Sequence, residues 1–297
     1  MCRMLIAVGR FEAGELRSMV RALREAAAYD PYGEALYGER SHDDGWGILI
    51  ARLDGSAALH HRSTRPIFSS GSDPESAIPG WAAGAPVVLM AHARKASEGT
   101  PVDLASTHPV HASSAWGDLY IVHNGSFDRG KLDGLIGEAA PHSDTWAAAV
   151  ALASRIRGGI SRRDLEWLLG AERTGANLGI VLLGAAAGPQ VIVGSHYRLR
   201  GDASDPDLER YYRLYECASD GGTIYASSTV VELHMGTRGC RALGNGEFHS
   251  RAGGLEVWNL LSVVELHMGT RGCRALGNGE FHSRAGGLEV WNLLSPT

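Results

Sequence analysis

The sequence of 297 residues contains no apolar stretch near the roughly 20 residues that a membrane-spanning helix needs. Its first apolar run, residues 4–8, is also shorter than the apolar part of a secretion signal. Lysine and arginine are scattered, and a net charge of -5 argues against the clustered basic surface by which proteins bind nucleic acid. We therefore expect a cytoplasmic protein with neither a membrane nor a nucleic acid as partner.

Phosphate and metal motifs are missing as well. The sequence has no GxxxxGK[ST] loop, which would cradle nucleotide phosphates, and no HExxH helix, which would hold zinc. Side chains of ligand type occur without the spacing of a helical ligand pair, at Asp43, Asp44, His92, His108, His111 and His123. We therefore expect neither a metal nor another cofactor.

Cysteine is rare, with four residues: Cys2, Cys217, Cys240 and Cys273. None belongs to a CxxC pair, and a reducing compartment disfavours disulfides, so we expect free thiols. Cys2 stands out because removal of Met1 would leave a thiol and a free α-amine on one residue. An α-amine has a pKa of about 7.7 to 8.0, so it can accept the thiol proton near neutral pH. Taken alone, a cysteine at position 2 is more often incidental.

What the sequence has in excess is a tandem repeat near its end. Residues 230–262 are followed by residues 263–295, which repeat them without a single change. Two copies cannot build a solenoid, and perfect identity indicates a recent duplication or an error in the gene. We expect the first copy to complete one domain, residues 2–262, and residues 263–297 to form a surplus tail.

The apolar pattern predicts more strands than helices. Helices are expected at residues 15–28, from Ser143 to about residue 157, and after Ser161, with both serines as N-caps. Strands are expected at residues 6–8, 47–52, 57–61, 87–91, 119–122, 178–183, 190–193, 223–226 and 255–260. The short turns between strands favour antiparallel sheets in a layered α+β arrangement over a doubly wound βαβ fold.

Short motifs follow one another in a characteristic order: MCRM, HDDGWGI, AHARKAS, THPV, IVHNGSF and HSDTW. Together they resemble class II glutamine amidotransferases of the N-terminal-nucleophile hydrolase superfamily, above all the stand-alone, single-domain type. The resemblance extends over residues 2–261. It implies a four-layer αββα sandwich, with residues 2–262 as a type 2 glutamine amidotransferase domain. It also implies hydrolysis of the side-chain amide of glutamine, or of a γ-glutamyl compound, through a thioester on Cys2.

The same resemblance assigns roles to residues of these motifs. Cys2 would be the nucleophile, and Asn124 and Gly125 would form the oxyanion hole. Arg94 would bind the α-carboxylate of the substrate, for which a guanidinium fork is well suited. Asp144 would bind the substrate ammonium group. Taken singly, each residue also has a structural interpretation: an ion pair for Arg94, a hairpin turn for Asn124 and Gly125, and a helix-dipole acid for Asp144.

One departure from the family pattern concerns the rim of the pocket. Members often have Asp-Ser/Thr-Glu where this sequence has Asp144, Thr145 and Trp146. Because the glutamate is missing, we expect the pocket to differ in its details while the aspartate keeps its role.

The sequence leaves three functions open. Residues after 177 suffice only to finish the sandwich, so a separate synthase subunit would have to use any released ammonia. Alternatively, the chain hydrolyses a γ-glutamyl amide of a small-molecule pathway, as the related γ-glutamyl amidohydrolase of ergothioneine biosynthesis does. A third function, a non-catalytic glutamine-binding regulatory module, would be favoured by retention of Met1, which would acylate the α-amine. The sequence indicates neither the ammonia acceptor nor the oligomeric state.

Overall fold

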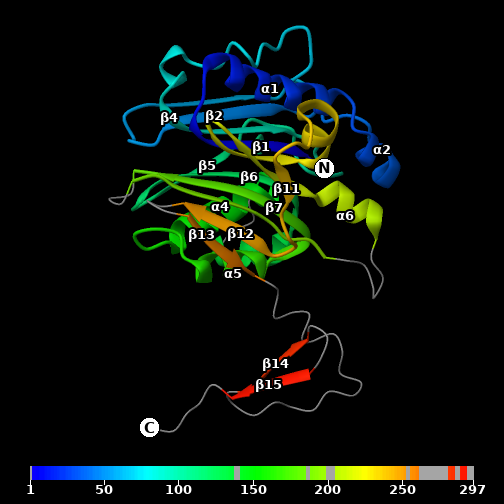
Figure 1. Ribbon diagram of the computed structural model, residues 1–297, viewed down its shortest axis with the longest axis vertical. Coiled ribbons are helices and arrows are strands. Elements are labelled where there is room, and N and C mark those ends of the chain that lie inside the picture. The colour runs from blue at the N-terminus through cyan, green and yellow to red at the C-terminus, as the bar shows by residue number, and fades with distance from the viewer. Residues whose placement is uncertain are drawn as a thin grey trace. The chain divides into compact units, whose positions relative to one another are not determined.

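The structure is a computed structural model that describes residues 2–136, 141–184, 188–198, 205–251, 255–260, 280–284 and 288–292. It divides into two compact units, Met1–Leu260 and Leu261–Thr297 (Figure 1). No helix in the described ranges is long and apolar enough to span a membrane.

The first sheet of the Met1–Leu260 unit has seven strands in the order β11-β9-β10-β1-β4-β2-β3. In that order the strands span Cys240–Ala242, Leu214–Ser219, Gly222–Ser227, Arg3–Arg10, Pro86–Ala93, Trp46–Arg52 and Ala58–Ser63. Every pair is antiparallel. Because β1 lies between β10 and β4, Cys2 comes just before a central strand of the sheet rather than before an edge strand.

The second sheet has six strands in the order β13-β12-β8-β7-β6-β5. In that order the strands span Leu255–Asn259, Glu247–Arg251, Gln190–Ser195, Glu172–Leu183, Gly117–Phe127 and Val110–Ser114. These pairs are antiparallel too, and a β-bulge interrupts the β6–β7 register between Gly125 and Phe127.

Helices cover the outer faces of both sheets. Figure 1 shows α1 (Ala13–Ala28) on the first sheet and α4 (Asp144–Arg155) and α5 (Arg162–Leu169) on the second. The remaining helices are short: α2 (Pro31–Tyr37), η1 (Gly80–Ala82), α3 (Arg129–Ile136), α6 (Pro206–Tyr212), α7 (Ser228–Val230) and η2 (Val231–Met235). A capping box at Ser161 and Asp164 begins α5, and the Ser143 side chain caps α4, as the sequence predicts.

Three separate apolar layers confirm the expected αββα sandwich. Leu5 and Ala7 of β1 belong to the core beneath α1, whereas Met4 and Ile6 of the same strand belong to the core between the two sheets. A third core joins the second sheet to α4 and α5. Alternate residues of a strand point to opposite faces, so β1 supplies both of its neighbouring layers at once.

The expectation of free thiols is wrong for two of the cysteines. Cys217 and Cys240 form a disulfide, while Cys2 is free. The pair lies directly opposite on the antiparallel strands β9 and β11, and its Cα atoms are 3.9 Å apart. The sequence separation of 23 residues gives no sign of this contact, because strand pairing brings the two residues together.

The first copy of the repeat contributes to both sheets. It supplies β11 to the first sheet and β12 and β13 to the second. Side chains of the copy also join the sheets: His249 Nδ1 lies 2.9 Å from Tyr225 Oη, and Arg251 Nη2 lies 3.0 Å from Thr223 Oγ1. In the Leu261–Thr297 unit, β14 (Glu280–Arg284) and β15 (Leu288–Asn292) pair as β12 and β13 do.

We expect removal of residues 263–295 to leave the free energy of unfolding within about 0.5 kcal/mol of the full chain, because one copy already completes the sheets. Since the copies are identical, deleting either one yields the same polypeptide. Removal of residues 230–295 is the contrasting variant, and it should prevent folding because both sheets lose strands. Thermal melts of the three chains test this. Strong destabilisation of the single-copy chain would mean that the second copy is part of the folded domain.

Candidate active site

Strand alternation brings three polar residues into the layer between the sheets. The apolar part of this layer includes Met4, Ile6 and Val8 of β1, Val88 and Met90 of β4, and Val122 of β6. Cys2, His92 and Asn124 continue the same alternation at one end of each strand. The sequence motifs around these residues thus meet where the apolar core stops.

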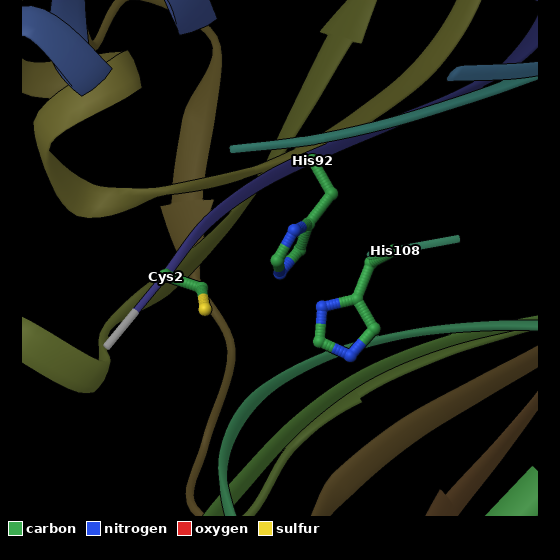
Figure 2. A group of neighbouring side chains, drawn as sticks. All are labelled: Cys2, His92 and His108. Atoms are coloured by element: carbon green, nitrogen blue, oxygen red, sulfur yellow. The ribbon is translucent and has the colours of Figure 1, made fainter. Parts of the chain in front are cut away.

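Cys2 is only 6% exposed and lies immediately before β1. Its backbone N–H donates to Asn124 Oδ1 at 3.0 Å, and its Sγ lies 3.7 Å from the Lys95 carbonyl oxygen. Figure 2 shows the sulfur directed toward the rings of His92 and His108. The thiol and the nitrogen that would become the α-amine are thus both buried close to Asn124, which is 122 residues away in sequence.

Asn124 is fully buried in β6, and its two amide atoms differ in their hydrogen bonding. Oδ1 accepts the Cys2 N–H, whereas Nδ2 is buried and has no hydrogen-bond partner among the described residues. A buried N–H donor without a partner is costly, so such a group marks a place where a ligand oxygen is expected. The free donor lies next to the nucleophile candidate.

Gly125 follows Asn124 at the bulge in β6 and has a φ of 146°. A Cβ at this position would lie 1.7 Å from the Gly175 carbonyl oxygen, so no other residue fits without moving the backbone. The Asn-Gly pair is therefore not the hairpin turn that its dipeptide suggests, since β6 runs on to Phe127.

Arg94 comes directly after β4 and is 2% exposed. The turn before β2 holds its backbone: Arg94 N–H donates to the Gly45 carbonyl at 2.8 Å, and Asp44 N–H donates to the Arg94 carbonyl at 2.9 Å. Nη1 of its guanidinium is buried with no hydrogen-bond partner in the described part of the chain. A second unsatisfied donor, this one charged, thus lies one residue before the Lys95 carbonyl that contacts Cys2.

Asp144 begins α4 and is attached to the end of β6. Its Oδ2 accepts the Phe127 N–H at 2.7 Å, and its Oδ1 accepts the Thr145 N–H at 2.8 Å. Asp144 and Gly125 both line a cavity of about 1040 Å³, whose wall also includes Arg129, Arg173 and Arg198. The carboxylate therefore faces a polar cavity, next to the glycine of the Asn-Gly pair.

Arg3 and Asp30 form a buried ion pair that the sequence analysis missed. Both side chains are fully buried, and Arg3 Nη2 lies 2.6 Å from Asp30 Oδ2. Arg3 Nη1 also donates to the carbonyl oxygens of Cys2 at 3.4 Å and Tyr211 at 3.2 Å, and His42 Nε2 lies 2.7 Å from Asp30 Oδ2. Because Arg3 follows Cys2 directly, this pair positions the nucleophile candidate. An arginine within an apolar strand pattern was the only sequence signal for it.

The Asp30 ion pair predicts a pH-dependent stability. Burial alone would raise the pKa of the Asp30 carboxyl, but the Arg3 charge and the bond from His42 outweigh it and lower that pKa from 3.8 to about 2. Because this pKa is lower in the folded state than in the unfolded state, the carboxylate stabilises the fold at pH values above the unfolded-state pKa. This stabilisation is lost as the pH falls from about 4 to 2. The expected loss is about 2 kcal/mol, from the size of the shift.

Replacing Asp30 by asparagine tests this directly. We expect Asp30→Asn to lower the free energy of unfolding at pH 7 by about 3–5 kcal/mol, because the Arg3 charge stays buried without its partner. Chemical denaturation at pH 7, 4 and 2 should also show a weaker acid dependence than in the unchanged chain. Asp220→Asn, at the exposed turn between β9 and β10, is the matched control and should change neither quantity. Equal stability of both variants would exclude a stabilising Arg3–Asp30 pair.

Two buried histidines complete the surroundings of Cys2. They belong to the AHARKAS and THPV motifs and are of metal-ligand type, but the sequence predicted no catalytic role for them. His92 is 0% exposed and His108 is 4% exposed, and their ring centroids are 4.2 Å apart in an edge-to-face arrangement. Burial lowers the pKa of both imidazoles well below the ordinary value, with further lowering by the Arg94 charge. Both rings are therefore neutral at pH 7. The His108–Pro109 peptide bond is cis.

Comparison with known proteins bears on the fold. A glutamine phosphoribosylpyrophosphate (PRPP) amidotransferase from B. subtilis, complexed with ADP and GMP, matches with a TM-score of 0.53 and 14% identity, over 87% of this chain and 49% of that chain. The allosteric regulatory enzyme of purine biosynthesis gives a TM-score of 0.53 and 15% identity, over 87% and 49%. A predicted glutamine amidotransferase from Pseudomonas aeruginosa PA01 gives a TM-score of 0.41 and 14% identity, over 86% and 94%.

The first two structures show that this chain has the fold of an N-terminal-nucleophile glutamine amidotransferase domain. The resemblance inferred from the sequence motifs is confirmed at this level. The chain spans about half the length of these two enzymes. The sequence matches no protein-family model and no curated protein.

Proposed function

We propose that this chain is a glutamine-type amidohydrolase in which Cys2, after removal of Met1, is the nucleophile. The observation that carries the proposal is the arrangement of Asn124, which holds the Cys2 nitrogen with Oδ1. Its Nδ2 is buried without a hydrogen-bond partner among the residues that the structure describes. One side chain would thus orient the base and stabilise the charge that develops on the substrate. The fold supports this proposal, since it is that of glutamine amidotransferase domains.

The reaction begins with proton transfer from the Cys2 thiol to its own α-amine. The thiolate then attacks the amide carbon, and the carbonyl electron pair moves to oxygen, which accepts hydrogen bonds from Asn124 Nδ2 and the Gly125 N–H. Collapse of the tetrahedral intermediate breaks the C–N bond, and the leaving nitrogen takes the proton from the α-ammonium. Water then attacks the γ-glutamyl thioester and gives a proton to the α-amine. The C–S bond breaks, the acid is released, and the thiolate takes the proton back from the α-ammonium.

Arg94 and Asp144 would hold the amino-acid head of the substrate. The free Nη1 of Arg94 would pair with the α-carboxylate, and the Asp144 carboxylate would accept from the α-ammonium group. The backbone of Arg94 and the carboxylate of Asp144 are held by hydrogen bonds to neighbouring elements, so little freedom is lost on binding. Fixing both ends of the head places the side-chain amide at the sulfur, which is the main advantage of a preorganised site.

The cavity favours a γ-glutamyl compound as a second candidate substrate beside glutamine. A volume of about 1040 Å³ adjoins Gly125 and Asp144, and it exceeds what one amino acid needs. A γ-glutamyl amide with a sizeable amine part would use this space. In that case the product is an amine, and no synthase subunit is required; with glutamine, a separate synthase would receive the ammonia.

Intact mass after incubation with an electrophilic glutamine analogue tests the proposal. We expect a species without Met1 that carries one adduct, and no adduct in Cys2→Ala. Glutamine and a series of γ-glutamyl amides, assayed in parallel for released ammonia or amine, separate the two substrates. A chain that retains Met1, binds glutamine and hydrolyses none of these compounds would instead be a non-catalytic binding module.

A further inference from the structure

Cys2, His92 and His108 place three metal-binding side chains together in the buried layer between the sheets (Figure 2). One donor atom from each residue, the Cys2 sulfur and one ring nitrogen of each histidine, lies within 4.8 Å of the others. The residues come from the start of β1, from β4 and from the segment before β5. Sulfur and imidazole nitrogen are the donors that Zn²⁺ and related transition metals prefer.

The hydrogen bonding of His92 leaves one nitrogen free to bind a metal. Its Nε2 lies 3.2 Å from the His123 carbonyl oxygen. A carbonyl oxygen can only accept, so Nε2 carries the proton and the lone pair of the neutral ring is on Nδ1. Nδ1 is buried and has no hydrogen-bond partner among the described residues. Metal-binding histidines in proteins are usually held in this way, with the other ring nitrogen donating to a backbone carbonyl.

His108 has fewer hydrogen bonds than His92. Both of its ring nitrogens are buried, and neither has a hydrogen-bond partner in the described ranges. Its ring stands edge-to-face against that of His92. Unpartnered polar atoms in a buried site are costly, and a bound ligand would relieve this cost. The histidines of this cluster therefore offer at least two ring nitrogens without a hydrogen-bond partner among the described residues.

We propose that Cys2, His92 and His108 form a site for one thiophilic divalent metal ion such as Zn²⁺. The metal displaces the thiol proton to solvent and binds the thiolate together with one nitrogen of each ring. Once Met1 is removed, the Cys2 α-amine can close a five-membered chelate ring as the fourth ligand. Tetrahedral zinc needs donor atoms about 3.4 to 3.6 Å apart, so the three residues approach by about 1 Å through small side-chain rotations.

The metal would act as a reversible inhibitor rather than as a catalyst. A metal on the Cys2 sulfur occupies the electron pair that attacks the amide, and coordination of the amine removes the base. The nearby Arg94 charge opposes a cation, so a strong chelator should release the metal. This consequence for turnover rests on the proposed function, whereas metal binding itself does not.

Cobalt binding gives a test that requires no substrate. Titration of the full chain, freed of Met1 as verified by intact mass, with Co²⁺ should produce a thiolate-to-cobalt charge-transfer band that saturates at one equivalent. Cys2→Ala should lose the band, and His108→Gln should weaken binding by at least about 10-fold. His61→Gln replaces a histidine of β3 outside the cluster and is the matched control, with unchanged binding. Retention of the band in Cys2→Ala, or equal affinity in His108→Gln, overturns the site.

Protection of the thiol provides the second measurement. Zn²⁺ should slow alkylation of Cys2 by iodoacetamide, followed by peptide mass, and a chelator should restore the rate. Protection should need His108 and should be unchanged in His61→Gln. Protection that persists in His108→Gln would indicate zinc on the thiolate alone and would overturn the three-residue site. If the chain binds Co²⁺ as expected but hydrolyses no amide, the proposed function fails and the metal site stands.

Discussion

Replacing Cys2 by alanine is expected to lower turnover by about a millionfold, which is the size of the loss when a hydrolase loses its nucleophile. The residual rate would come from the oxyanion hole and from binding alone. Substrate should still bind, because Arg94 and Asp144 are unchanged. The fold should be retained as well, since the only hydrogen bond of the sulfur within the described ranges is long, 3.7 Å to the Lys95 carbonyl oxygen.

The control for this variant is the cysteine of the second repeat copy. Cys273→Ala makes the same chemical change outside the Met1–Leu260 unit, and turnover should be unaffected. Release of ammonia or amine, measured at saturating substrate, together with a thermal melt, separates lost chemistry from lost folding. Turnover by Cys2→Ala near that of the unchanged chain would exclude a Cys2 thioester and leave the reaction to another group.

Asn124→Ala is expected to lower kcat by about 100- to 1,000-fold with a much smaller effect on KM. The amide donor acts mainly on the negative oxygen of the tetrahedral intermediate, so its loss raises the barrier more than it weakens binding. The variant also removes the acceptor at 3.0 Å from the Cys2 nitrogen, which would leave the amine less well oriented.

The partner strand offers a closely matched control. Asn177 lies directly opposite Asn124 in the β6–β7 register and is equally buried. Both of its amide atoms have hydrogen-bond partners: Nδ2 donates to the Tyr212 carbonyl oxygen at 2.6 Å, and Oδ1 accepts from Ser195 Oγ at 2.7 Å. Asn177→Ala should therefore lower the melting temperature but leave kcat of the folded enzyme within a few-fold. Similar kcat losses in both variants would mean that Asn124 acts through the fold rather than on the substrate.

Strands with strong apolar patterns were predictable, and weakly patterned strands were not. Residues 87–91 and 223–226 were expected as strands, and β4 and β10 are there with small differences at their ends. β5 was missed because Val110–Ser114 is short and has only two apolar residues, and β9 because Leu214–Ser219 mixes polar and apolar residues without a clear alternation. Their pairing with β6 and β10 stabilises them as strands, and this information lies outside the segments themselves.

The site divides in the same way. The family resemblance of the ordered motifs singled out Cys2, Arg94, Asn124, Gly125 and Asp144, and strand alternation allowed Cys2 and Asn124 to face one layer. The sequence did not indicate the buried ion pair between Arg3 and Asp30, because the two residues are 27 positions apart and only folding brings them together. Nor did it indicate that His92 and His108 lie against Cys2, because ligand-type residues at wide spacing carry no signal of contact.

The sequence by itself determined the layered α+β class, the repeat, the candidate nucleophile and the residues proposed to act with it, because these depend on local pattern and motif order. Only the tertiary structure decided which strands are neighbours, and with that the Cys217–Cys240 disulfide, the buried Arg3–Asp30 pair and the Cys2–His92–His108 cluster. Long-range strand pairing sets these contacts, and its register depends on burial of both sheet faces at once.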